Sequence, residues 1–343
     1  MKAVFLIIDY VPHQELTIRK LAEENDFEIL AYHVAKFNKS VPIIHNFKTS
    51  LYTDSSKENI FKSIIQFKPD IVVVAGWMIK EYVWIAKKLR SSLNVPIVSY
   101  SDTQWYGTIK QRVNALISPF HVKKAFSHIW VAGLYQFEYA RKLGFKKENI
   151  ILNSLTADVD LFKKINLENK QKNYPKNFLY IGRFSSEKGL DILISAWNTI
   201  TDKNGWTLTL IGDGVLKNKF SNLDNIIVKD YMSQKELLKE IENSGCFVLP
   251  SLVEPWALVL HEAAISGLPI ICTNVCGAAP HFIINKYNGY LIKPSIVSDM
   301  RNALENIIQL NDQKLYTFSL RSRELGLRIT PETSINSLKQ LLK

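Results

Sequence analysis

The stretch LPSLVEPWALVLHEAAISGLP, residues 249–269, decides which fold and which kind of site we expect for this chain. It begins with the end of an apolar strand and continues through a short polar loop that holds Glu254. A helix follows, and we expect it to end at Gly267, because glycine commonly closes helices and Pro269 cannot continue one. The stretch therefore predicts a strand, a loop and a helix, with Glu254 just before the helix and Glu262 inside it.

The start of this helix is suited to binding phosphate. Backbone N–H groups in a first turn have no acceptor within the helix, and the helix dipole is positive there, so those around Leu258 and Val259 can hold a diphosphate. Helical side chains lean toward their own N-terminus, which directs Glu262 toward the same ligand. Because a carboxylate would repel phosphate, we expect Glu254 and Glu262 to accept hydrogen bonds from sugar hydroxyls on either side of it. A nucleotide-sugar has that layout of ribose, diphosphate and sugar.

The same stretch resembles the Glu-x7-Glu signature of family-four retaining glycosyltransferases of the GT-B fold. The matching positions are Glu254, Pro255, Leu258, Val259, Glu262, Ala263, Gly267 and Pro269. Trp256 replaces a phenylalanine of the signature and Ala257 replaces a glycine. The alternative is an ordinary strand, loop and helix with two solvated glutamates, and the shared spacing favours the glycosyltransferase.

A second segment, YIGRFSSEKGLDILISAW at residues 180–197, carries the cations that such a site needs. Gly182 lets the backbone approach a ligand closely, Arg183 can bind phosphate oxygens through its planar guanidinium, and Lys188 adds a point charge. The segment is similar to the GRxxxxKG motif of the family, whose arginine and lysine hold the donor diphosphate. Two surface cations near a turn are the alternative, which would not explain the pairing with Glu254.

The base of the nucleotide is expected near Tyr231 and Met232. The resemblance implies that family members contact the base at these positions, largely through the backbone. Packing of the Tyr231 ring in the protein core is an equally weighted alternative.

The length and composition favour two α/β domains. A chain of 343 residues is long for one domain, and 47% of its residues are apolar. The amino-terminal stretch MKAVFLIIDY is too short for a signal peptide or a spanning helix, so we expect a buried first strand. The three cysteines, Cys246, Cys272 and Cys276, indicate a reduced, cytosolic setting and lack the further ligands of a structural zinc site, so no metal is expected.

Apolar runs alternate with helical patterns along the chain. In the first half they are AVFLIID, EILAYHV, DIVVVAG, VPIVSYS, HIWVAG and ENIILNS, and in the second KNFLYIG, WTLTLIG, NIIVKDY, CFVLPS and LPIICTN. Runs that are apolar throughout are typical of parallel sheets covered by helices on both faces. The predicted fold class is therefore α/β with two doubly wound, Rossmann-like domains, which in the GT-B fold face an interdomain cleft.

The predicted domain boundary lies in the polar segment 162–177, which contains Pro175. We therefore expect an N-terminal domain over residues 1–165 and a C-terminal domain over residues 166–330. The resemblance implies that the C-terminal domain binds the nucleotide-sugar and the N-terminal domain binds the acceptor. It also implies that a last helix within residues 331–343 crosses back to the first domain.

The first domain departs from the family pattern at two places. Many members have two glycines in the first loop, where this chain has none, and we expect His13 or Gln14 to serve there with its side chain. Many members also have a histidine after the fourth strand, near the reacting sugar. Asp102 or Gln104 is expected to occupy that place.

The net charge of +11 is unevenly distributed. Residues 1–165 hold 23 of the 43 basic and 15 of the 32 acidic residues, a balance of +8, which leaves +3 for the rest. The basic residues of the first half cluster at Lys110, Arg112, Lys123, Lys124, Arg141, Lys142, Lys146 and Lys147, among Ile109, Val113, Leu116, Phe120 and Phe126. Such a segment can lie on an anionic membrane surface, or it can form core-facing helices with solvated lysines. Nucleic-acid binding is not expected, because no nucleic-acid module accompanies the charge.

The motifs together imply a retaining, metal-independent glycosyltransferase that needs no cofactor. It would move a sugar from a UDP- or GDP-sugar to a hydroxyl of a glycan or lipid-linked glycan, in bacterial polysaccharide or glycoconjugate synthesis, in the cytoplasm or on the inner face of the membrane. Arg183 and Lys188 would stabilise the leaving diphosphate and Glu254 would hold the sugar, while a donor phosphate oxygen accepts the acceptor proton. The alternatives are a nucleotide-sugar epimerase of related fold and a non-catalytic nucleotide-sugar or glycan binder.

Overall fold

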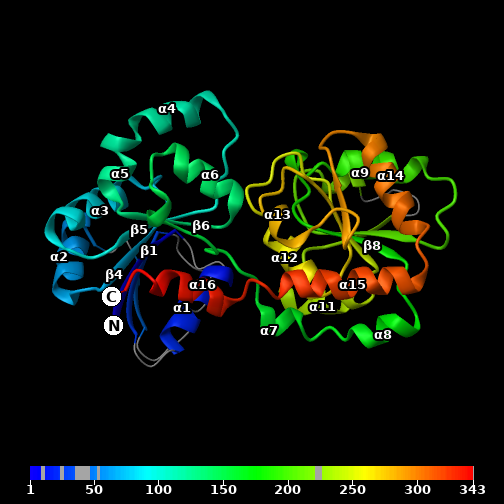
Figure 1. The fold of residues 1–343 in the computed structure, drawn as a ribbon, viewed down its shortest axis with the longest axis horizontal. Coiled ribbons are helices and arrows are strands. Elements are labelled where there is room, and N and C mark those ends of the chain that lie inside the picture. Colours follow the sequence, from blue (N-terminus) through cyan, green and yellow to red (C-terminus); the bar gives the residue numbers. More distant parts are fainter. Residues whose placement is uncertain (9–11, 24–26, 35–46, 52–54, 221–225, 343) are drawn as a thin grey trace. The chain divides into compact units, whose positions relative to one another are not determined.

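The computed structural model describes residues 1–8, 12–23, 27–34, 47–51, 55–220 and 226–342, without the side chains of Pro12, His13 and residues 47–51. The chain divides into two compact units (Figure 1). The first unit contains Met1–Thr156 and Ile329–Lys343, and the second contains Ala157–Arg328. Each unit is built around its own parallel sheet.

Within the described residues, the sheet of the first unit has seven strands in the order β3-β2-β1-β4-β5-β6-β7. The strands are β1 (Lys2–Ile7), β2 (Glu28–His33), β3 (Phe47–Leu51), β4 (Ile71–Ala75), β5 (Ile97–Ser101), β6 (His128–Val131) and β7 (Ile150–Ile151). The helices are α1 (Pro12–Glu23), α2 (Lys57–Phe67), α3 (Lys80–Ser92), α4 (Ile109–Ile117), η2 (Ser118–Phe120), α5 (Val122–Ala125), α6 (Leu134–Lys142), η3 (Lys147–Asn149) and α16 (Pro331–Lys339).

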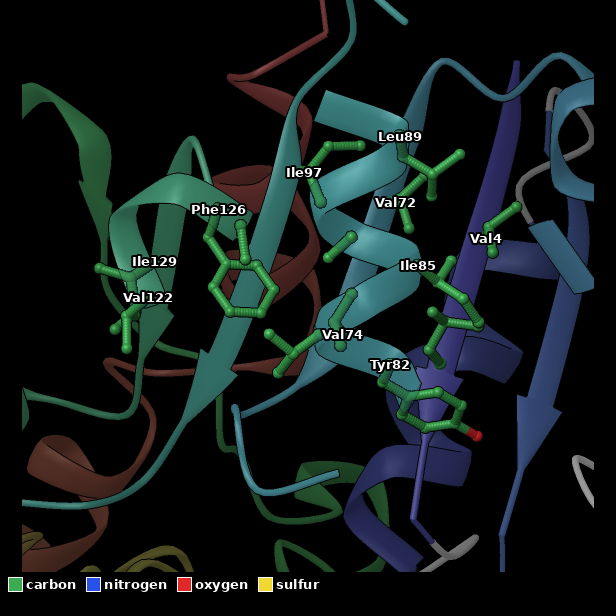
Figure 2. Packing of buried hydrophobic residues seen from close by; sticks show 14 of the residues in the cluster. Val4, Val72, Val74, Tyr82, Ile85, Leu89, Ile97, Val122, Phe126 and Ile129 are labelled. Carbon is green, nitrogen blue, oxygen red and sulfur yellow. The ribbon is translucent and has the colours of Figure 1, made fainter. Parts of the chain in front are cut away.

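Helices cover both faces of this sheet. On one face, Ile85 and Leu89 of α3 pack against Val72 and Val74 of β4, as Figure 2 shows. On the other face, α1 and α16 are joined to the strands by a second buried cluster that includes Ile335. Because both faces are covered, every residue of β4 is buried, which is the reason for its continuous apolar sequence.

In the part of the second unit that the structure describes, the sheet has six strands in the order β10-β9-β8-β11-β12-β13. The strands are β8 (Asn177–Ile181), β9 (Thr207–Ile211), β10 (Ile226–Lys229), β11 (Cys246–Leu249), β12 (Ile270–Thr273) and β13 (Gly289–Ile292). The helices are α7 (Val159–Phe162), α8 (Leu167–Lys172), η4 (Ser186–Lys188), α9 (Leu190–Thr199), α10 (Lys217–Phe220), α11 (Gln234–Glu242), α12 (Leu258–Ile265), α13 (Ala279–Phe282), α14 (Val297–Ile308) and α15 (Asp312–Gly326). The predicted fold class, α/β with two doubly wound sheets, is confirmed.

The division between the units lies ahead of the segment 162–177 in which the sequence predicts it. That segment is polar on average, yet Leu167 and Tyr174 are buried in the second unit. The Tyr174 hydroxyl donates a hydrogen bond of 2.8 Å to the carbonyl oxygen of Gly245, which fixes the segment against β11. The last helix, α16, belongs to the first unit and packs against α1.

In the part of the chain that the structure describes, no helix is both long enough and apolar enough to cross a bilayer.

Candidate functional site

The predicted site residues of the second unit gather at the carboxyl ends of its central strands. In the strand order, the chain runs outward from β8 to β9 and β10 on one side, and from β11 to β12 and β13 on the other. The direction reverses between β8 and β11, and open α/β sheets bind ligands at such a reversal. Arg183 and Lys188 follow β8, while Glu254 follows β11, so the two quoted motifs meet at this point.

Lys188 and Glu254 form an ion pair across the reversal point. The Lys188 Nζ donates to Glu254 Oε2 at 2.5 Å, and their side chains are only 14% and 9% exposed. The Ser251 hydroxyl donates to the same carboxylate oxygen at 3.2 Å. The carboxylate of Glu254 is thereby fixed in one orientation beside the lysine.

Gly189 explains how closely the two loops approach. Its φ is +67°, a conformation that side chains disfavour, and a Cβ there would lie 2.2 Å from the carbonyl oxygen of Pro250. The neighbouring Leu252 N–H donates to the Glu187 carbonyl oxygen at 2.8 Å. A glycine is therefore required for the loop after β8 to pack on the loop after β11.

Arg183 is more exposed than Lys188. Its guanidinium lies 3.4 Å from Glu187 Oε1, and its side chain is 76% exposed. A hydrogen bond from the Ser185 hydroxyl is the main cause that lowers the pKa of Glu187, with help from the nearby cations, so Glu187 is a charged partner of Arg183 at neutral pH. The sequence did not identify Glu187 as part of the site, because glutamate at an exposed turn is common.

The N-terminus of α12 lies directly after Glu254. Ala257 caps the helix with φ +79° and ψ 74°, a left-handed conformation that explains why the family signature has glycine there. Leu258 and Val259 form the start of the first turn, whose N–H groups have no acceptor inside the helix. The loop before the helix is held by hydrogen bonds from the N–H groups of Gly277 and Ala278 to the carbonyl oxygens of Glu254 and Trp256.

Glu262 lies one turn further along α12 and is buried. Its Oε1 accepts a hydrogen bond of 2.7 Å from the side-chain amide of Gln234. Burial raises the pKa of Glu262 to about 7, against the smaller opposing effect of that hydrogen bond. Gln234 was not predicted, since only the folded chain brings the start of α11 to α12.

Tyr231 and Met232 lie between β10 and α11, just ahead of Gln234. The Tyr231 side chain is 75% exposed, so the alternative of a core-packed ring is wrong. Both residues thus lie close in sequence to Gln234, the residue that hydrogen-bonds Glu262. The exposed Tyr231 ring is accessible to a ligand.

In the first unit, a pocket of about 490 Å³ lies at the carboxyl ends of β4 and β5. Gln14 and Asp102 both line it, while Gln104 does not and has a buried side chain. The His13 side chain lies outside the described residues. Aromatic and polar side chains that the sequence did not single out complete the pocket, among them Trp77, Tyr100, Tyr106, Asn114 and Tyr139.

Two doubly wound, Rossmann-like units are the architecture of the GT-B fold of glycosyltransferases. A structure of Anabaena HepE in complex with UDP superimposes on the whole chain with a TM-score of 0.79, at 17% sequence identity, covering 100% of this chain and 99% of that one. Residues 161–319, which lie in the second unit, match the family model described as glycosyl transferases group 1. The resemblance that residues 249–269 indicate is thus confirmed.

Curated relatives resemble part of the chain. A glycogen synthase of Mycobacterium tuberculosis is 25% identical over 260 residues, which are 71% of this chain and 61% of that protein. An uncharacterized 41.2 kDa protein in the cps region of Klebsiella pneumoniae is 29% identical over 166 residues, 46% of this chain and 45% of that protein. The chain thus spans about half of the length of these curated relatives.

Proposed function

We propose that the protein is a retaining, metal-independent glycosyltransferase that moves a sugar from a nucleotide-diphosphate-sugar to an acceptor hydroxyl. The observation that carries the proposal is the ion pair between Lys188 and Glu254 at the N-terminus of α12, where the sheet reverses direction. A cation for phosphate and a carboxylate for sugar hydroxyls are held there side by side.

The donor is proposed to lie along the start of α12. Its diphosphate accepts hydrogen bonds from the N–H groups of Leu258 and Val259 and is neutralised by Arg183 and Lys188. Glu262 holds the ribose hydroxyls, and the exposed Tyr231 ring covers the base. UDP- and GDP-sugars both fit these contacts; HepE, whose fold is shared, has been crystallised with UDP and with UDP-glucose.

In the proposed reaction, the new bond to the anomeric carbon of the sugar forms on the same face from which the old bond is lost. The bond between the anomeric carbon and the diphosphate oxygen breaks, and a bond to the acceptor oxygen forms. The acceptor proton passes to an oxygen of the leaving diphosphate, so the protein supplies no general base. Arg183 and Lys188 stabilise the negative charge that develops on the leaving group, and Glu254 orients the sugar.

The acceptor is proposed to bind the pocket of the first unit. Asp102 and Gln14 can hydrogen-bond hydroxyls, and the aromatic side chains around them offer flat surfaces for sugar rings. A glycan or a lipid-linked glycan fits this lining, in a bacterial polysaccharide or glycoconjugate pathway. The proposed location is the cytoplasm, at the inner face of the membrane.

A donor panel with candidate acceptors tests the proposal. A nucleotide-sugar that binds should raise the melting temperature by mass action, and its sugar should then appear on an acceptor. Isomerisation of the donor without acceptor would instead indicate an epimerase. Binding of the donor with neither reaction, across a broad acceptor panel, would indicate a non-catalytic binder.

The two glutamates separate the roles within this proposal. Above pH 7, where Glu262 is ionised, Glu262→Gln should weaken binding of the bare nucleotide, because the carboxylate is a stronger acceptor for ribose hydroxyls than an amide. Glu254→Gln should leave nucleotide binding undiminished and lower sugar transfer. The reverse result would mean that the donor lies in the opposite orientation.

A further inference from the structure

Helix α4 and the η2 turn after it expose their apolar side chains. Ile109, Leu116 and Phe120 are 77–81% exposed, and Val113 and Ile117 are 47% and 45% exposed. These five residues, which we name the α4–η2 face, are adjacent at Leu116 and Ile117 and otherwise three or four positions apart, so they lie on one side of the helix. In Figure 1, α4 is at the outer edge of the first unit, away from its sheet.

The opposite side of α4 is polar and faces the protein. Gln111 is the buried residue of the helix, and its side-chain amide donates to the Gln104 carbonyl oxygen at 2.7 Å. Its Oε1 accepts a hydrogen bond from the Tyr106 N–H, also at 2.7 Å. The helix is therefore attached through a glutamine and turns its apolar side to solvent, the reverse of an ordinary surface helix. The interpretation as core-facing helices is therefore wrong for residues 109–120, whereas Phe126, just after α5, is buried as that interpretation expects.

Positive charge surrounds the α4–η2 face. Lys110, Arg112, Lys123 and Lys124 are all exposed, and the sequence has no Asp or Glu between Asp102 and Glu138. Exposed apolar patches of this kind mark interaction surfaces, and this one requires a partner with an apolar interior and a negative surface. An anionic lipid bilayer has both properties.

We propose that the α4–η2 face docks on an anionic lipid bilayer, with its apolar side chains in the interface and the four cations at the headgroups. A second copy of the chain is a poorer partner. A two-fold contact would place Lys110, Arg112, Lys123 and Lys124 against their own equivalents, and like charges at an interface oppose association.

The same helix also lines the pocket of the first unit, through Lys110, Gln111 and Asn114. Docking would therefore bring the pocket beside the bilayer surface. This inference rests on the proposed function where it concerns the acceptor, and it selects the lipid-linked glycan over the free glycan as the acceptor class.

Vesicle sedimentation tests the docking directly. The protein should sediment with phosphatidylglycerol vesicles at low salt, bind phosphatidylcholine vesicles weakly, and dissociate as salt rises. Leu116→Ser with Phe120→Ser should reduce the binding at least tenfold, while Lys123→Ser with Lys124→Ser should reduce its dependence on salt. Leu320→Ser with Leu327→Ser removes two partly exposed leucines of the second unit and serves as the matched control.

A fluorescent label tests insertion independently. The three native cysteines are buried, so a cysteine introduced by Leu116→Cys can be labelled selectively with a polarity-sensitive dye. The emission should shift to the blue with phosphatidylglycerol vesicles, and the same dye at Leu320→Cys should not respond.

Three outcomes would overturn the docking. The first is that the wild-type protein does not bind anionic vesicles at low salt. The second is that the Leu116→Ser/Phe120→Ser variant binds them as well as the wild type does. The third is that the wild type self-associates but does not bind vesicles, and that the variant no longer self-associates. Titration with UDP and GDP keeps the two proposals apart. If the protein binds vesicles but no nucleotide, the proposed glycosyltransferase function is contradicted and the docking is not. If it binds a nucleotide but no vesicles, the docking is contradicted and the proposed function is not.

Discussion

Lys188 and Arg183 carry the same charge but stand in different surroundings. Lys188 is nearly enclosed and paired with Glu254 at 2.5 Å, whereas Arg183 projects into solvent beside Glu187 at 3.4 Å. Removing the enclosed cation leaves a buried carboxylate without its counter-charge next to the proposed diphosphate. Lys188 is therefore the residue whose loss should affect nucleotide binding more.

We expect Lys188→Ala and Arg183→Ala each to weaken nucleotide binding. A charge-assisted hydrogen bond contributes roughly 1.5–3 kcal/mol, so calorimetry with the cognate nucleotide should show about a tenfold or larger loss, greater for Lys188→Ala. Lys172→Ala, an exposed cation on α8, is the control and should bind normally. Unchanged affinity in both site variants would contradict the assignment of the diphosphate.

Glu262 should make stability depend on pH. Its folded pKa of about 7 lies above the ordinary value of 4.5, so the stabilisation by its proton is complete below pH 4.5 and is lost as pH rises through 7. Since one pKa unit corresponds to about 1.4 kcal/mol, Glu262→Gln should gain up to about 3 kcal/mol over wild type at pH 8 and nothing at pH 4.5. Urea unfolding at the two pH values measures the difference. An equal effect at both would show that Glu262 is charged when folded.

At the scale of elements, α8 is joined to α11 by a buried lysine. The Lys170 Nζ donates to the carbonyl oxygens of Ser244 at 2.7 Å and Ile241 at 3.3 Å, at the C-terminal end of α11. Burial, together with the positive charge of Arg323, lowers the pKa of Lys170 to about 7 from 10.5. The buried surroundings thus disfavour the charged ammonium form of Lys170, although its hydrogen bonds join the two helices.

We expect Lys170→Met to show this cost. Between pH 7 and 10.5 the unfolded lysine holds a proton that the folded one has lost, so the wild type becomes more stable as pH rises through that window. Relative to Lys170→Met, the gain should be about 1.4 kcal/mol per pH unit, measured by urea unfolding between pH 7.5 and 9.5. Parallel curves for the two proteins would mean that Lys170 remains charged in the fold.

The sequence predicted the strands better than the environment of the helices. Strands such as Ile71–Ala75 are buried on both faces, so their composition alone identifies them. The side of α4 that faces solvent could not be predicted, because it depends on the hydrogen bonds of Gln111 with the segment before the helix. The polar composition of residues 162–177 likewise hid the burial of Leu167 and Tyr174.

The approach of the two motifs of the candidate site could be predicted from the sequence, because both follow strands of one parallel sheet. The carboxyl ends of neighbouring parallel strands meet at one edge of a sheet, so residues after β8 and β11 had to approach each other. The side-chain partners of the site residues could not be predicted from the sequence. The pairs of Arg183 with Glu187 and of Gln234 with Glu262 depend on side-chain positions within loops and at helix starts.

The whole molecule consists of two units, of which the first is discontinuous in sequence. Its last segment, Ile329–Lys343, supplies α16, and Ile335 and Leu338 of that helix are buried in the core of the first unit. The candidate nucleotide site lies wholly in the second unit, which begins at Ala157 and ends at Arg328. A ligand of that site should therefore change the stability of the second unit, whereas a substitution in α16 should change the stability of the first.

We expect two separable effects in calorimetric unfolding. Leu338→Ala leaves a cavity in the first unit, which typically costs about 2–5 kcal/mol, and should lower the transition of that unit while the second keeps its nucleotide binding. The cognate nucleotide at about 100 times its Kd should stabilise the second unit by about 2.7 kcal/mol and raise the other transition. Leu304→Ala, a buried leucine of α14, is the matched control and should lower the nucleotide-sensitive transition instead. If Leu338→Ala and the nucleotide shifted one common transition, the two units would unfold as a single cooperative body.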